Sequence, residues 1–146
     1  MSMKETQEKL AARMREWQRL EDATIAHTAK INTKTENPLL RMVMDIIQRD
    51  SVMHRRVQQL IIDSLQKEQI NVPVDDLAAI WDAVEQHVEM ERKTIELGEC
   101  SLRELEGRGN VVQRYLLSYL KTDEEKHEKM LSDLHLIKKG MYPSSG

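Results

Sequence analysis

The chain has 146 residues, about the length of one domain and enough to bury a real core. Its 22 basic and 25 acidic residues give a net charge of -3 without a strongly single-signed stretch, which argues against nucleic acid or an anionic membrane as a partner. We find no apolar run approaching the roughly 20 residues of a membrane span and no signal peptide, so we expect a cytoplasmic protein. The single cysteine, Cys100, predicts no internal disulfide.

Few residues in this sequence break helices: it has five glycines and three prolines. The breaks that occur predict four helices, over residues 3–31, 38–68, 76–106 and 111–139, with a flexible tail at 140–146. Asn37 before Pro38, Asp75 and Asn110 are the expected N-caps, and Gly140 is the expected stop. The connections are too short to run the length of a long helix, so consecutive helices should be antiparallel. We therefore predict an all-α, up-down-up-down four-helix bundle that forms a single domain, 1–146.

Each predicted helix carries an apolar stripe at steps of three and four, and acids or histidines interrupt every stripe. Counting outward from the connections at about 1.5 Å per residue places the interruptions within roughly one helical turn of each other. The first and second helices would contribute Glu21, Asp50 and His54, and the third and fourth Glu91, Asp123 and His127. Both helix pairs then repeat one pattern, an acid followed by Asp-x-x-x-His.

Four carboxylates in one buried layer require protonation, pairing or a metal, because a buried charge without a partner is costly. Two divalent cations would balance the four acids, and two neutral imidazoles complete a ligand set suited to iron or manganese. A metal-free alternative stays open, in which the acids and histidines bond one another and fix the register of the helices. A small organic ligand at the same layer is a third reading.

At these residues the sequence resembles the ferritin-like, rubrerythrin-like di-iron carboxylate proteins, which take a Glu from each of two helices and Glu-x-x-His from each of the others. Glu21 and Glu91 match the lone glutamates, and His54 and His127 match the histidines. Helix four has a literal Glu-x-x-His at Glu124, but Ser51 holds the equivalent position on helix two. Asp50 and Asp123 are therefore the preferred acids. Glu124 and His87 are the reserve candidates.

The resemblance implies two metal ions, with iron expected and manganese or zinc as alternatives. It also implies oxidase, peroxidase or ferroxidase chemistry by analogy alone. The rival function is a metal-free helical interaction or structural module. A homodimer is compatible with either function, and neither needs nucleic acid or a membrane.

Overall fold

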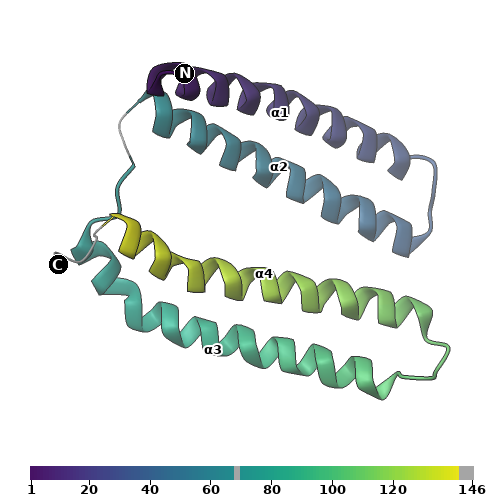
Figure 1. Cartoon of the computed structure of the whole chain (residues 1–146). Helices are drawn as coiled ribbons and strands as arrows, with labels where there is room; N and C mark the ends of the chain where they lie inside the picture. The colour runs from purple at the N-terminus through teal and green to yellow at the C-terminus, as the bar shows by residue number, and fades with distance from the viewer. Residues whose placement is uncertain (68–69, 142–146) are drawn as a thin grey trace. The chain divides into compact units, whose positions relative to one another are not determined.

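The computed structural model describes residues 1–67 and 70–141, and its regular structure is helical (Figure 1). The four helices are α1 (Met3–Asn32), α2 (Pro38–Gln66), α3 (Val74–Glu104) and α4 (Val111–Met141). No strand occurs in these described residues, which confirms the all-α prediction. Within the same residues, no helix combines the length and the apolar character that crossing a membrane demands.

The chain divides into two compact units, Met1–Ile70 and Asn71–Gly146, and a pair of packed helices builds each unit. Figure 1 shows each pair as a hairpin closed by a short connection. That both hairpins belong to one four-helix bundle and one domain stays a prediction.

In the first hairpin, side chains at both ends link α1 to α2. Arg15 Nη2 donates a hydrogen bond of 2.6 Å to Gln66 Oε1, and Asn32 Nδ2 donates one of 3.0 Å to Asp45 Oδ1. The first half of α1 thus lies beside the end of α2, and the end of α1 lies beside the first half of α2. The two helices are antiparallel neighbours, as expected from their short connection.

The second hairpin has the same arrangement of α3 and α4. The rings of Trp81 and His135 lie 5.7 Å apart near one end. Toward the other end, Lys121 Nζ lies 3.8 Å from Glu99 Oε1. These pairs again join an early residue of one helix to a late residue of the other.

Local signals account for several helix ends. Asn37 caps α2 as predicted, because its Oδ1 accepts from the backbone N–H groups of Leu39 and Leu40. Ser2 and Glu5 form a capping box on α1. The carbonyl of Asn110 accepts from the backbone N–H of Arg114 at the start of α4.

Other predicted ends differ from the structure. Asp75 is not the cap of α3: Pro73 holds that position, and Asp75 lies in the first turn, where a carboxylate interacts favourably with the helix dipole. α3 ends at Glu104 rather than 106, ahead of Gly107, which has a left-handed φ of 72°. Gly140 does not stop α4, which continues to Met141, since a single glycine weakens a helix without breaking it. α2 ends at Gln66, and the predicted end at 68 and the tail from 142 lie outside the described residues.

Candidate metal centre

Each hairpin sets a buried glutamate of its first helix against a histidine of its second. Glu21 Oε1 lies 3.5 Å from His54 Nδ1, and Glu91 Oε1 lies 3.5 Å from His127 Nδ1. Both glutamates are 7% exposed. The structure thus brings together, hairpin by hairpin, the glutamate and histidine that counting along the chain placed at one height.

The second hairpin adds another carboxylate to its pair. Glu124 precedes His127 by three residues on α4, and its Oε2 lies 3.8 Å from His127 Nδ1. Glu91, Glu124 and His127 each offer one ligand atom, and these three atoms lie within 4.8 Å of one another. We call these three residues the α3–α4 cluster. Among the described residues, this is the one group of three histidine, cysteine or acidic side chains whose ligand atoms lie close enough to share a metal ion.

Glu91 is the most buried member of the cluster. Its Oε1 lies 2.9 Å from His87 Nε2, one turn earlier on α3. Its Oε2 is buried and, while Glu124 is ionised, has no hydrogen-bond donor among the described residues. Because a buried carboxylate oxygen is costly without a partner, this atom needs a proton donor or a cation beside it.

The neighbouring carboxyl group of Glu124 can act as that donor only while it carries a proton. Hydrogen bonding with Glu91, followed by burial, raises the pKa of Glu124 above its ordinary value. The same hydrogen bond lowers the pKa of Glu91, and the hydrogen bond from His87 adds to the effect. The cluster therefore keeps Glu91 ionised and Glu124 protonated over part of the acidic range.

Thr94, which no sequence motif indicated, also lies beside the cluster. Its hydroxyl oxygen lies 2.7 Å from the carbonyl oxygen of Glu91 and 3.1 Å from Glu124 Oε2. Its single proton can be donated to one of these oxygens at a time. The available signal was its place three residues after Glu91, on the same side of the helix.

The two aspartates that were the preferred ligands from the sequence do not take the expected positions. Asp50 is exposed, whereas Ser51 beside it is 5% exposed. Asp123 Oδ2 lies 3.4 Å from His127 Nε2, on the opposite ring nitrogen from Glu91 and Glu124, and its Oδ1 pairs with Lys126 at 2.8 Å. Neither aspartate is in the α3–α4 cluster, and on α4 the reserve candidate Glu124 is.

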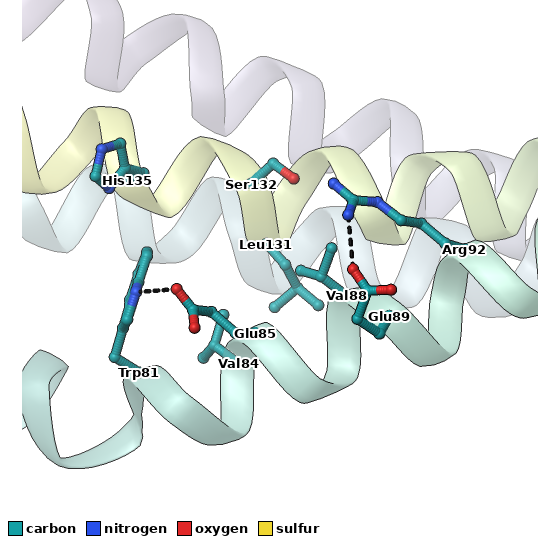
Figure 2. A pocket seen from close by; sticks show the side chains of 9 residues that line it. All are labelled: Trp81, Val84, Glu85, Val88, Glu89, Arg92, Leu131, Ser132 and His135. Carbon is teal, nitrogen blue, oxygen red and sulfur yellow. Dashed lines mark hydrogen bonds and ion pairs between the residues drawn. The ribbon is translucent and has the colours of Figure 1, made fainter.

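Several grooves lie along the second hairpin. One, of about 230 Å³, is lined by His87, Glu91, His127, Met130 and Leu131, and so gives access to the cluster. Another, of about 600 Å³, contains none of the cluster residues (Figure 2). Its polar side chains bond one another: Trp81 Nε1 donates to Glu85 at 2.8 Å, and Arg92 Nη1 donates to Glu89 at 2.7 Å.

The donor set of the cluster fits a divalent transition metal. Carboxylate oxygens and an imidazole nitrogen suit iron, manganese and zinc, and no thiolate is present to favour a softer ion. His87 adds a further imidazole next to Glu91. The buried Oε2 of Glu91 is the atom that would gain most from a cation.

No protein-family model, curated protein or solved structure matches the chain. The resemblance to ferritin-like proteins therefore still depends on the sequence motifs alone.

Proposed function

We propose that this chain binds a divalent transition metal at the α3–α4 cluster, with Glu91, Glu124 and His127 as its ligands. The observation that carries the proposal is the buried Glu91 Oε2, which has no donor among the described residues once Glu124 is ionised, in a cluster whose three ligand atoms lie within 4.8 Å of one another. A cation would offset the burial of Glu91 and displace the proton from Glu124.

We further propose that the metal is iron and that two ions bind, as in the di-iron carboxylate proteins that the sequence resembles. Two ferrous ions would supply the two electrons that, with two protons, reduce one peroxide molecule to two water molecules. The chain's own residues would hold the metal and leave the groove beside His87 open to a small oxidant. This oxidase, peroxidase or ferroxidase step is a proposal by analogy.

Metal analysis of the full chain, purified without chelator and then loaded anaerobically with ferrous iron, tests the binding. We expect His127→Ala and Glu124→Gln to lose the tightly held metal. Glu125→Gln is the matched control, because Glu125 is the next residue along α4 and its side chain is 52% exposed. If both cluster variants keep as much metal as this control, the cluster is not the site. Consumption of peroxide by loaded protein then tests the redox step separately.

A metal-free helical module remains the second candidate, and the first hairpin provides the observation in its favour. Buried polar side chains lie between α1 and α2: Gln18 Nε2 donates to the carbonyl of Arg55 at 3.2 Å and to Gln59 Oε1 at 3.1 Å. Such bonds can fix the register of two helices without a metal. Unchanged thermal stability on addition of ferrous, manganese or zinc ions would favour this function, since a ligand that binds the folded state must stabilise it.

A further inference from the structure

The two hairpins share a glutamate–histidine pair, but the residues beside the pair differ. Three residues before the histidine, α4 has Glu124 and α2 has Ser51. Ser51 is 5% exposed and lies on the buried side of α2. A serine hydroxyl is neutral and a weaker metal ligand than a carboxylate. The first hairpin therefore lacks one charged ligand that the second has.

A second difference lies one turn before each glutamate. α3 has His87 there, with Nε2 2.9 Å from Glu91 Oε1. α1 has Trp17, whose indole nitrogen is a donor only and cannot bind a metal. The first hairpin is left with one carboxylate, Glu21, and one imidazole, His54.

Glu21 nevertheless has the features of a ligand that lacks a sufficient partner. Its side chain is only 9% exposed, and the closest charged or ionisable group is His54 Nδ1 at 3.5 Å. No hydrogen bond reaches its carboxylate from the part of the chain that the structure describes. Unlike Glu91 Oε2, neither oxygen of Glu21 is a fully buried atom without a partner, so the carboxylate stays open to a cation from solvent.

We propose that Glu21 and His54 form a second, weaker site for the same divalent metal, and that the α3–α4 cluster fills first. This inference rests on the proposed function above. The cluster has two carboxylates and the first hairpin has one. The cluster should therefore bind metal first, because the affinity of a site of this kind rises with the number of charged ligands. The affinity of the Glu21–His54 site is low because Ser51 stands where α4 has a carboxylate.

Calorimetric titration of the full chain with cobalt(II), which resists oxidation in air, tests the order. We expect two steps, with the second at least about tenfold weaker than the first. Glu21→Gln should remove the second step and leave the first unchanged. Ser51→Glu restores the missing carboxylate and should strengthen the second step by about tenfold.

Ser64→Glu is the matched control for Ser51→Glu. It makes the same chemical change on the same helix, ten residues or about 15 Å beyond His54. It should leave both steps unchanged. Because Ser51 is buried, circular dichroism must show that the glutamate variant folds, and Ser51→Asp offers a smaller side chain for the same test.

The outcomes separate the inference from the proposed function. Loss of the tight step in Glu124→Gln and His127→Ala, together with a single step in the wild type and in both Ser51 variants, would overturn the second site and the proposal of two ions, and would leave metal binding at the α3–α4 cluster supported. Equal strengthening by Ser51→Glu and Ser64→Glu would overturn it as well, because added charge alone would then explain the gain. Retention of the tight step in the two cluster variants would instead overturn the proposed function itself.

Discussion

The two hairpins share a plan but differ in what lies between their helices. One turn after the histidine, α2 has Gln58, which is 4% exposed, and α4 has the half-buried Leu131. One turn before the glutamate stands Trp17 in α1 and His87 in α3. The first hairpin thus buries a neutral amide beside its pair and has no imidazole before its glutamate, whereas the second has an apolar side chain and an imidazole at these positions. Substitutions that exchange these features test whether the difference decides where a metal binds.

The largest expected effect is on metal affinity and comes from the two glutamates. Glu91→Gln should weaken the tight step by about 100-fold or more, because a neutral amide replaces the charged ligand. Glu21→Gln should leave that step unchanged. Calorimetric titration with cobalt(II) measures both, and Glu96→Gln, an exposed glutamate of α3, is the control. Equal weakening by Glu91→Gln and Glu21→Gln would mean that the hairpins do not differ as proposed.

A stabilising change is expected when the first hairpin is made to resemble the second. Gln58 Oε1 is buried and accepts no hydrogen bond from the described residues. Gln58→Leu copies Leu131 and removes this cost, so it should raise the free energy of unfolding by about 1–2 kcal/mol in urea denaturation. The neighbouring Gln59→Leu should lower it, since Gln59 bonds both Gln18 and Asp63. Stabilisation by both variants would mean that added apolar surface alone is responsible.

The pH dependence of the metal-free protein should identify the shared proton of the second hairpin. The raised pKa of Glu124 adds to the free energy of unfolding. This stabilisation is complete below the group's ordinary pKa of 4.5 and is lost as pH rises through the raised pKa of the folded state. The lowered pKa of Glu91 acts in the other direction, because its contribution is present above 4.5 and is lost as pH falls through its folded pKa.

Glu124→Gln should therefore remove the decline in stability above pH 4.5, because an amide donates to Glu91 without a proton to lose. Relative to the wild type, this variant should gain about 1 kcal/mol in free energy of unfolding by pH 7. Urea denaturation between pH 4 and 7 measures the difference, with Glu125→Gln as the control. Parallel curves for Glu124→Gln and the wild type would show that no proton is shared.

Much of the fold could be predicted from the sequence, because local chemistry decides it. The Asn37–Pro38 start of α2 and the start of α4 at Val111 depend on residues within a few positions. The pairing of Glu21 with His54, and of Glu91 with His127, follows from helical rise and short connections. The choice between Asp123 and Glu124 did not follow, because adjacent residues differ by about 100° around a helix and a stripe is about that wide.

The sequence also could not show the roles of Thr94 and Ser51. Thr94 reaches Glu124 through a hydroxyl whose direction depends on how closely α3 and α4 approach. Ser51 is buried while Asp50 is exposed, and only the packing of α2 against α1 decides which of the two faces inward. Helical spacing therefore predicts which turn of a helix contains the site, but only the packing of the helices decides which side chains of that turn face it.

The smallest expected effect concerns the close approach of α3 and α4 at Gly98. A methyl group added at Gly98 would lie 3.4 Å from Lys121 Cβ, which is close to ordinary contact. Gly98→Ala should therefore fit and raise the free energy of unfolding by about 0.5–1 kcal/mol through its higher helix propensity. Gly98→Leu should lower it, because the longer side chain must push the helices apart at the second hairpin. A loss of stability in Gly98→Ala would show that α3 and α4 require glycine at this position.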